Sequence, residues 1–581
     1  MIERFDIGFH PFVVPFLAGM VFVLAVCLVK GAIAIGELDR DDRRKWALSL
    51  IRPDIIVKNI VGIVLDCLLH VKLWKRNRLL GYMHSAIAFG WFMIILLGHL
   101  QVLLYMPQRL GTFYYPIFFD YFVEGGQHTL VSYALDFFLG VVLSGIALAV
   151  FKRFYSRIFG MRRTARPSFT NLIGLYSLWA IFPLRLLAEQ CARAGDLSVV
   201  PWWGYSIALC SFMTVLPFSR YLHIPAEMLL VTFRNAGVGV TCPGKGMARL
   251  QADACPNCGV CIDACPMSAD RANLRDSTVY LTRQLRRGNS RRINEISDKC
   301  LLCGKCTSVC QVGVDGPRLR ILSRAARKYK ISPSFSSATV ASASASASAS
   351  ASASGKVLYF GGCMSALTPQ IGRSVESLLR KAGVEYEWLD RDGGLCCGRP
   401  LHTAGRLKQA AELADRLSEI IIGSGAHTLL VSCPICYREF HERYALEGVR
   451  VVHYADYFAE LMDAGLLHLE KGDSCYVYHD PCELGRGCGI YDSPRRLISK
   501  AAAIAEAPKN RAESVCCGGS LGSLTLSFAQ REKITRASLE NLYESRADAI
   551  ATACPLCQAT FARYSDRPVK DLAQIIDEQT K

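Results

Sequence analysis

The feature that most constrains this chain is a pair of cysteine runs that lie between Cys255 and Cys310. The first run reads CPNCGVCIDACP and the second reads CLLCGKCTSVC, so two, two and three residues separate successive cysteines in each. This spacing is typical of two cubane [4Fe–4S] clusters. Thiolates are soft donors that suit iron. Zinc or disulfides are the alternatives, but zinc sites use pairs of close cysteines rather than runs of four.

In such a pair of clusters, the fourth cysteine of each run ligates the other cluster. The first predicted ligand set is therefore Cys255, Cys258, Cys261 and Cys310. The second predicted set is Cys300, Cys303, Cys306 and Cys265. Pro266 follows the first run as expected, whereas Gln311 takes that place after the second. Two adjacent clusters form a path for electron transfer. The rest of the chain must supply the electron donor and acceptor sites at the two ends of this path.

The composition divides the chain into two parts. With 581 residues, 25 cysteines, a net charge of +17 and a mean hydropathy of +0.22, it is neither one soluble domain nor a secreted disulfide scaffold. Before residue 240 cysteines are scarce, and five apolar segments approach the roughly 20 residues that a bilayer requires. The predicted spans are Phe12 to Ile35, Leu79 to Met106, Leu130 to Phe151, Phe169 to Leu187 and Trp203 to Leu222.

Lysine and arginine concentrate in the loops after the first and third predicted spans, while the opposite loops have only Arg109 and Arg193. This asymmetry predicts an N-terminus outside the cell and a cytoplasmic location for everything after residue 223. The first span is too long for a signal peptide and lacks a basic leader and cleavage site. We therefore expect a multi-pass protein of the cytoplasmic (inner) membrane with lipid around it and no nucleic-acid partner.

A redox wire attached to membrane spans predicts haem, which needs histidines at membrane depth. His84 lies near the cytoplasmic start of the second span and His223 at the cytoplasmic end of the fifth, so the two match in depth. They are the predicted axial ligands of one haem b. The alternative is an interfacial histidine pair without metal. A second, outer haem would use His99 with His128 or His10, and His70 in the basic loop is expected to be solvated.

Ionisable residues also lie near the outer ends of the third and fourth spans, at Asp136, Arg185 and Glu189. Charge within a membrane marks a functional site by default, and a site that oxidises quinol must handle protons. The competing interpretation is that these side chains extend to the interface.

Residues 331 to 355 are rich in serine and alanine and end in an Ala-Ser repeat. Such a segment cannot bury a core and is predicted to be a linker. As a random coil it would span about 25–30 Å, too far for useful electron transfer, so the next domain must dock onto the cluster region.

An internal repeat follows the linker, with corresponding cysteines 119 to 121 residues apart. Strand-like runs lead into each cysteine motif and helical stretches separate them, so each repeat is predicted to be α/β. Five thiolates from three loops require a cluster larger than one zinc ion. The candidate catalytic cysteines are Cys363, Cys396, Cys397, Cys433 and Cys436 in the first repeat, and Cys482, Cys516, Cys517, Cys554 and Cys557 in the second.

This repeat resembles the duplicated cysteine-rich CCG domain of heterodisulfide reductases. The resemblance implies that each five-cysteine motif holds a noncubane [4Fe–4S] cluster at which disulfides are cleaved. The segment HDPCELGRGCGIYDSPR, His479 to Arg495, is similar to the second unit of that family. The cluster region resembles the same catalytic subunit.

The membrane half resembles the haem-b subunits related to the nitrate reductase gamma chain. In that resemblance His84 and His223 correspond to the inner haem pair. The family's further histidine at the start of the last span is absent here, where Trp202 to Ser206 stand instead. His99 also departs from the spacing of the second ligand, so the resemblance supports one haem.

We therefore predict a multidomain fusion: an all-α, five-helix transmembrane haem domain, an α-helical ferredoxin-like 2[4Fe–4S] domain and a duplicated α/β CCG domain. The predicted boundaries are 1–235 for the haem domain, 240–330 for the ferredoxin-like domain, 331–355 for the linker, 356–470 for the first repeat and 471–581 for the second.

Two functions follow from the resemblance. In the first, the protein is an enzyme that passes electrons between the quinone pool and a cytoplasmic thiol or disulfide substrate, through haem b, two cubane clusters and two noncubane clusters. In the second, it relays electrons from an electron-transfer flavoprotein to a quinone such as menaquinone, and is similar to membrane-bound electron-transfer-flavoprotein:quinone oxidoreductases.

Overall fold

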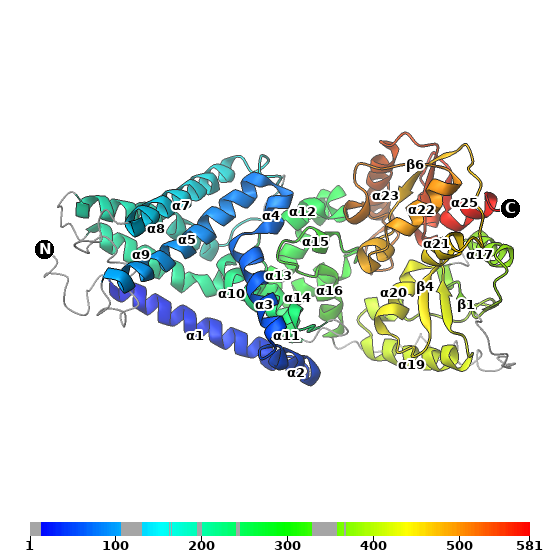
Figure 1. The fold of residues 1–581 in the computed structure, drawn as a ribbon, viewed down its shortest axis with the longest axis horizontal. Helices are drawn as coiled ribbons and strands as arrows, with labels where there is room; N and C mark the ends of the chain where they lie inside the picture. Colours follow the sequence, from blue (N-terminus) through cyan, green and yellow to red (C-terminus); the bar gives the residue numbers. More distant parts are fainter. Residues whose placement is uncertain are drawn as a thin grey trace. The chain divides into compact units, whose positions relative to one another are not determined.

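The computed structural model describes residues 13–105, 130–161, 163, 165–193, 200–239, 245–327, 357–364 and 368–581. It consists of two compact units (Figure 1). The N-terminal unit comprises Met1–Asp263, Leu285–Arg287 and Cys310–Val314. The C-terminal unit comprises Ala264–Gln284, Gly288–Val309 and Asp315–Lys581. The predicted linker lies outside the described residues.

The described residues of the N-terminal unit form helices and their connections. These are α1 (Val14–Gly36), α2 (Arg40–Ser49), α3 (Pro53–Ile63), the π-helix η3 (Val64–Leu68), α4 (Val71–Arg76), α5 (Arg78–Tyr105), α7 (Leu130–Phe154), α8 (Phe169–Arg193), α9 (Val200–Val215), the 3₁₀ turns η5 (Leu216–Phe218) and η6 (Arg220–Leu222), α10 (His223–Asn235), α11 (Lys245–Ala254) and α12 (Val260–Ala264), whose last residue belongs to the C-terminal unit.

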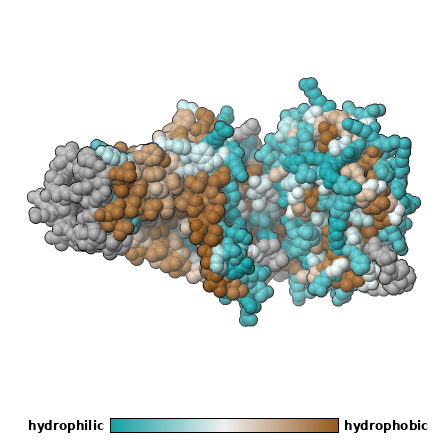
Figure 2. Space-filling model, in the orientation of Figure 1, coloured by the Kyte–Doolittle hydropathy of each residue, from teal (hydrophilic) through white to brown (hydrophobic). Residues whose placement is uncertain are grey.

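Four of these helices, α1, α5, α7 and α8, are long and apolar enough to cross a membrane. The predicted fifth span is a bent pair, Val200–Phe218 followed by Arg220–Asn235, with 77° between its halves. Pro217 interrupts the helix at the bend, because proline has no backbone N–H to donate. The described residues thus contain four helices that could cross a membrane, or up to five if the bent pair is counted as one span. Apolar side chains cover much of the surface of this unit (Figure 2).

Helices α5 and α7 pack closely because small residues lie between them. A Cβ atom built on Gly145 of α7 would lie 2.9 Å from the Ile87 Cγ1 atom and 3.0 Å from the Ala86 Cβ atom of α5. Small residues drive close helix packing in lipid, where burial of apolar surface gains little.

The cluster region of the C-terminal unit is built from short helices and turns. They are η7 (Pro266–Ala269), η8 (Arg271–Asp276), α13 (Thr278–Arg287), α14 (Ser290–Asp298), α15 (Lys305–Ser308) and α16 (Gly316–Ala325), with the end of α13 belonging to the N-terminal unit.

Each repeat folds around a four-stranded parallel sheet, as the α/β pattern predicted. The first sheet has the order β2-β1-β3-β4 and the second β6-β5-β7-β8. The strands are β1 (Val357–Phe360), β2 (Tyr386–Trp388), β3 (Thr428–Val431), β4 (Arg450–His453), β5 (Cys475–His479), β6 (Ala503–Ala505), β7 (Ala549–Thr552) and β8 (Val569–Asp571).

Helices connect these strands, as crossovers between parallel strands require. In the first repeat they are α17 (Pro369–Lys381), α18 (Arg399–Thr403), α19 (Leu407–Gly423), α20 (Pro434–Arg443) and α21 (Tyr454–Asp463). In the second they are the π-helix η12 (Glu483–Gly487), α22 (Asp492–Ala501), the 3₁₀ turn η13 (Arg511–Glu513), α23 (Phe528–Tyr543), α24 (Pro555–Ala562) and α25 (Leu572–Glu578). The helical stretches predicted between the cysteine motifs include α19 and α23.

One buried arginine joins three parts of the C-terminal unit. Arg324 on α16 is fully buried. Its guanidinium donates to the carbonyl oxygens of Ser297 at 2.5 Å, Thr403 at 2.6 Å and Gly522 at 2.7 Å. These three acceptors belong to the cluster region, the first repeat and the second repeat. Arg324 therefore holds both repeats against the cluster region.

Replacing Arg324 with alanine is expected to destabilise the C-terminal unit by about 3–5 kcal/mol, because three buried carbonyl groups lose a charged donor. Thermal unfolding of the full chain in detergent would show this as a lower midpoint. Arg291→Ala is the matched control, since that side chain is 92% exposed. Equal midpoints for the two variants would contradict the role given to Arg324.

Candidate redox centres

The parallel sheets position the cysteines of each repeat. Strands β1 and β3 are neighbours, with Val357 opposite Thr428, so their carboxyl ends meet at one edge. Cys363 follows β1 and Cys433 follows β3 at that edge. In the second repeat β5 and β7 are neighbours, and Cys482 and Cys554 follow them. Sequence motifs that lie about 70 residues apart in the chain are thereby brought together.

The Cys-Cys-Gly motifs complete each group from a third loop. Gly398 and Gly518 both have positive φ, at 80° and 88°. A Cβ on Gly518 would also lie 2.8 Å from the Thr535 hydroxyl oxygen. Only glycine adopts this conformation without strain, and it turns the chain so that both cysteine side chains before it face the site.

The five thiols of the first repeat lie together. Hydrogen bonds connect Cys396 to Cys363 and Cys397, and Cys436 to Cys397 and Cys433. The contacts from the Cys363 and Cys397 thiols lower the pKa of Cys396 to about 3, which favours the thiolate that ligates metal. Cys363 is exposed, Cys396 is half-buried and the other three are buried.

The five thiols of the second repeat also lie together. Cys516 is hydrogen-bonded to Cys482 and Cys517, and the Cys517 and Cys557 sulfurs are 3.3 Å apart. Cys554 contacts Cys557 in turn. Hydrogen bonds from Cys516 and Cys557 hold the pKa of Cys517 well below its ordinary value. Both groups therefore have the soft, closely spaced donor set that an iron–sulfur cluster needs.

A cavity reaches the second group of cysteines. Its lining includes Cys482, Cys517, Cys554 and Cys557. Arg399 from the first repeat and Leu302 from the cluster region also line it. Arg399 is buried and donates to Glu439 and Glu483, at 3.0 Å each. The cavity is thus bounded by residues of both repeats and of the cluster region.

The structure brings together three of the four cysteines of the first predicted ligand set and all four of the second. In the N-terminal unit the Cys310 thiol interacts with Cys255 and Cys258. In the C-terminal unit the Cys265 thiol interacts with the thiols of the second run, Cys300, Cys303 and Cys306. The crossed arrangement is therefore compatible with this backbone, and the roles of these cysteines as ligands stay predictions.

An arginine in the insert between the two cysteine runs fixes the first run. Arg286 donates to the carbonyl oxygens of Ala252 at 2.8 Å, Asp253 at 2.7 Å and Cys255 at 2.6 Å. These bonds hold the backbone at the start of the first motif.

The second cysteine run touches the second repeat directly. A hydrogen bond from the Cys516 thiol lowers the pKa of Cys303 to about 6. Arg486 donates to the Cys303 carbonyl oxygen at 2.8 Å and to the Ser514 carbonyl oxygen at 2.8 Å, which ties the two loops together. A predicted cubane ligand and a predicted noncubane ligand are therefore neighbours.

The predicted haem ligands have suitable orientations. The Nδ1 atom of His84 lies 3.2 Å from the Leu80 carbonyl oxygen, and that of His223 lies 2.6 Å from the Arg220 carbonyl oxygen. Because a carbonyl can only accept, each Nδ1 carries the hydrogen and each Nε2 is left as a possible metal ligand. Both rings interact electrostatically with His70, so three histidines gather here.

His70 differs from its predicted place in solvent. Its ring centroid lies 5.4 Å from that of His84, and its side chain is half-buried. The residue has φ of 50° at the start of α4, which turns its ring toward α5. Lys152 at the end of α7 was also missed; it interacts with both His84 and Cys258. Its cationic side chain thus lies near both the histidines and the first cysteine set.

The predicted outer haem has less support. His99 is exposed on α5, and its suggested partners His10 and His128 lie outside the described residues. Arg185 and Glu189, by contrast, form a buried ion pair at 2.8 Å on α8, and Arg185 also donates to the Tyr205 hydroxyl at 3.3 Å. These two side chains are therefore inside the helix bundle rather than extended to an interface. Asp136 is half-buried.

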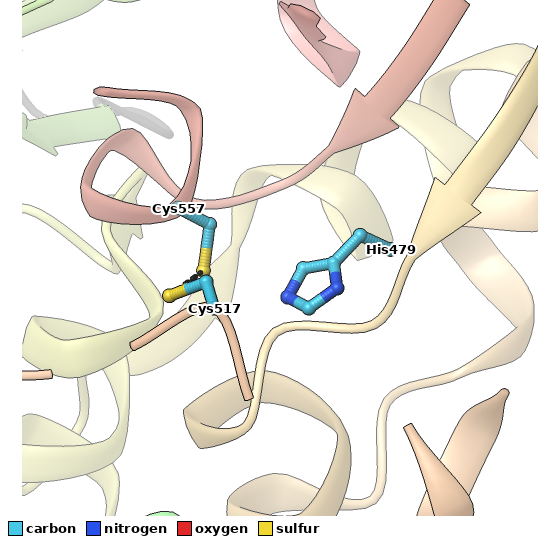
Figure 3. Close-up of side chains that lie close together, drawn as sticks. All are labelled: His479, Cys517 and Cys557. Atoms are coloured by element: carbon cyan, nitrogen blue, oxygen red, sulfur yellow. Dashed lines mark hydrogen bonds between the residues drawn. The ribbon is translucent and has the colours of Figure 1, made fainter. Parts of the chain in front are cut away.

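A histidine joins the cysteines of the second repeat. A ring nitrogen of His479 and the sulfurs of Cys517 and Cys557 lie within 4.8 Å of one another, and all three residues are buried (Figure 3). The sequence indicated His479 only as part of a resembling segment. Its place beside the sulfurs depends on β5, which ends at this residue.

Comparison with protein families identifies both types of cysteine motif. A model described as "Cysteine-rich domain" (CCG) matches residues 357–441 and 476–562. A model described as "4Fe-4S dicluster domain" matches residues 251–314. These matches confirm the predicted resemblance for the cluster region and the duplicated repeat.

Three curated relatives match parts of the chain. One subunit of the dihydromethanophenazine:CoB–CoM heterodisulfide reductase of Methanosarcina barkeri is 28% identical, over 38% of this chain and 58% of the relative. One subunit of the fumarate reductase (CoM/CoB) of Methanothermobacter marburgensis is 26% identical, over 35% and 41%. EtfAB:quinone oxidoreductase of Syntrophomonas wolfei is 28% identical, over 35% and 30%.

All three relatives are named as oxidoreductases, and this chain is related to them through iron–sulfur domains. The chain spans less than two thirds of the length of each of them. The assignment of the apolar helices as possible membrane spans, and of the histidines as possible haem ligands, therefore depends on this structure and its sequence.

If both runs and both repeats hold clusters, the protein purified without oxygen is expected to contain about 16 cluster irons, with equal labile sulfide and haem iron in addition. Iron, zinc and acid-labile sulfide analysis would measure this. Near-stoichiometric zinc with little sulfide would contradict the iron–sulfur interpretation.

Proposed function

We propose that this protein is a membrane-bound oxidoreductase that transfers electrons between the quinone pool and a cytoplasmic thiol or disulfide substrate. The observation that carries the proposal is the contact between Cys303 of the second cysteine run and Cys516 of the second repeat. It supports a continuous route from the cubane pair to a site of sulfur chemistry.

The proposed order of centres follows the contacts within each unit. In the N-terminal unit Lys152 lies near both His84 and Cys258, which supports transfer between haem b and the first cubane cluster. Cys265, which lies in sequence in the first run, belongs with the second ligand set. In the C-terminal unit Cys303 and Cys516 then lead into the second repeat.

At the membrane end, His84 and His223 would hold one haem b. The buried pair of Arg185 and Glu189 offers a carboxylate that can accept a proton when a quinol is oxidised, with the arginine holding it in place. The asymmetry of lysine and arginine favours an N-terminus outside and both repeats in the cytoplasm.

At the substrate end, the disulfide would react at the second repeat, where four of the five cysteines line a cavity. An iron–sulfur cluster bound by the five cysteines would supply single electrons for cleaving the S–S bond. Arg399 is positioned at the cavity wall by Glu439 and Glu483 and offers a cationic edge to an acidic substrate. The apolar Leu302, Ile435 and Leu556 would limit entry of water.

A second function remains, in which an electron-transfer flavoprotein donates through the repeats and the protein reduces quinone. Similarity to the EtfAB:quinone oxidoreductase of Syntrophomonas wolfei favours it. Similarity to a subunit of the heterodisulfide reductase of Methanosarcina barkeri favours the first function.

Parallel assays of the purified protein separate the two functions. One supplies a reduced quinol analogue with a panel of disulfides, and the other supplies reduced electron-transfer flavoprotein with quinone. The proposal predicts oxidation of quinol coupled to formation of thiols in the first assay. Activity only in the second assay would overturn it and leave the architecture intact.

A further inference from the structure

His479 is a buried side chain whose polar atom faces the second cysteine group. It is 2% exposed, and its Nε2 atom has no hydrogen-bond partner among the residues that the structure describes. The imidazole points toward the sulfurs of Cys517 and Cys557 (Figure 3). A buried nitrogen without a partner costs free energy, so a partner at this site would relieve that cost.

The first repeat has a phenylalanine in the equivalent place. His479 and Phe360 both end the first strand of their repeat, three residues before Cys482 and Cys363. The Phe360 ring packs edge-on against Phe440 at 5.0 Å and 87°.

The His479 ring packs in the same way against Phe561, at 4.7 Å and 84°. Phe440 and Phe561 themselves occupy equivalent positions, seven residues after Cys433 and Cys554. The two repeats thus use the same ring geometry with different chemistry: the second has an imidazole with a polar nitrogen beside its cysteines, and the first has an apolar phenyl ring at the equivalent position.

We infer that His479 donates a hydrogen bond from Nε2 to a sulfur of the cluster in the second repeat, and thereby gives this cluster a higher reduction potential than its counterpart in the first repeat. The inference rests on the proposed cluster in each repeat. Five cysteines already provide the ligands, so the histidine acts on a sulfur rather than as a further ligand. Hydrogen bonds to sulfur stabilise the more negative, reduced cluster.

This asymmetry gives the two repeats different tasks. The second repeat contacts Cys303, so it is the repeat that electrons reach first. A higher potential there would hold the first electron beside the cavity. His479 is therefore a positioning residue that determines which cluster holds the first electron. It distinguishes two sites whose cysteine motifs are alike.

Pulsed EPR of the full-length protein tests the inference. The signal of the second-repeat cluster is identified as the one lost in Cys482→Ser. In protein labelled with ¹⁵N-histidine, this signal is expected to show a weak nitrogen coupling, and the coupling should be lost in His479→Phe. The midpoint potential of the same signal should fall in His479→Phe and stay near the wild-type value in His479→Gln, which retains an N–H donor.

His453→Gln is the matched control, because His453 is also fully buried with an Nε2 atom that lacks a partner among the described residues. Its ring packs on Tyr437 and Tyr454 rather than on cysteines. This variant should leave coupling and potential unchanged. A wild-type signal without histidine coupling, or an unchanged potential in His479→Phe, would overturn the inference alone. Absence of any second-repeat signal in the wild-type protein would overturn the proposed clusters as well.

Discussion

Replacing Cys517 with serine is expected to abolish disulfide turnover while haem b and the cubane pair remain reducible by quinol. Cys517 is buried, contacts both Cys516 and Cys557, and lines the cavity. Its loss removes a thiolate from the centre of the second group, so the site of sulfur chemistry fails. The predicted ligands of the cubane pair are all elsewhere, in the two cysteine runs.

Turnover of disulfide by quinol and the haem spectrum after quinol addition measure the two parts of this prediction. Cys475→Ser is the control, because Cys475 lies at the start of β5 and outside the five-cysteine group. Retained disulfide turnover in the Cys517 variant would contradict catalysis at the second repeat. In the relay function, the same variant would instead stop quinone reduction by flavoprotein.

Replacing either His84 or His223 with alanine is expected to eliminate the low-spin b-type haem spectrum. Each imidazole is oriented by a carbonyl oxygen, of Leu80 or Arg220, and a low-spin haem requires two axial ligands. Reduced-minus-oxidised optical spectra of the membranes measure the loss. His99→Ala is the control, since His99 is exposed on α5.

An intact spectrum in the His84 variant would move the ligand to another histidine, and His70 is the nearest candidate because its ring lies 5.4 Å away. A spectrum reduced by half in His99→Ala would instead indicate the outer haem.

The cysteine groups were predicted from local patterns in the sequence. The spacing of each run and the duplication of the cysteine motifs depend on short stretches of chain. The strands before Cys363 and Cys482 and the helices α19 and α23 follow from hydrophobic periodicity. The family matches to residues 251–314, 357–441 and 476–562 agree with these predictions.

Contacts between segments that are distant in the chain could not be predicted from the sequence. Cys303 and Cys516 meet through the packing of two domains, and no local pattern indicates that neighbour. His70 was expected in solvent because its surroundings are basic, but a left-handed backbone turn brings it to His84. The charges of Arg185 and Glu189 were visible four residues apart, whereas their burial depends on α9, which supplies Tyr205.

The bend in the fifth predicted span could not be predicted from amino-acid composition. Residues 203 to 222 are apolar enough for a span, yet Pro217 ends the helix and the chain turns by 77° before α10. Hydropathy counts apolar residues and does not register the direction of the helix axis.

Reoxidation of haem b by a disulfide tests most directly the claim that one wire joins the membrane haem to the sulfur site. The protein is reduced without oxygen, freed of excess reductant and mixed with a disulfide in a stopped-flow spectrometer. The account predicts that haem b is oxidised as the disulfide takes up two electrons and two protons to give two thiols, and that Cys517→Ser prevents this. Haem that stays reduced with every disulfide, while quinone oxidises it, would contradict the account.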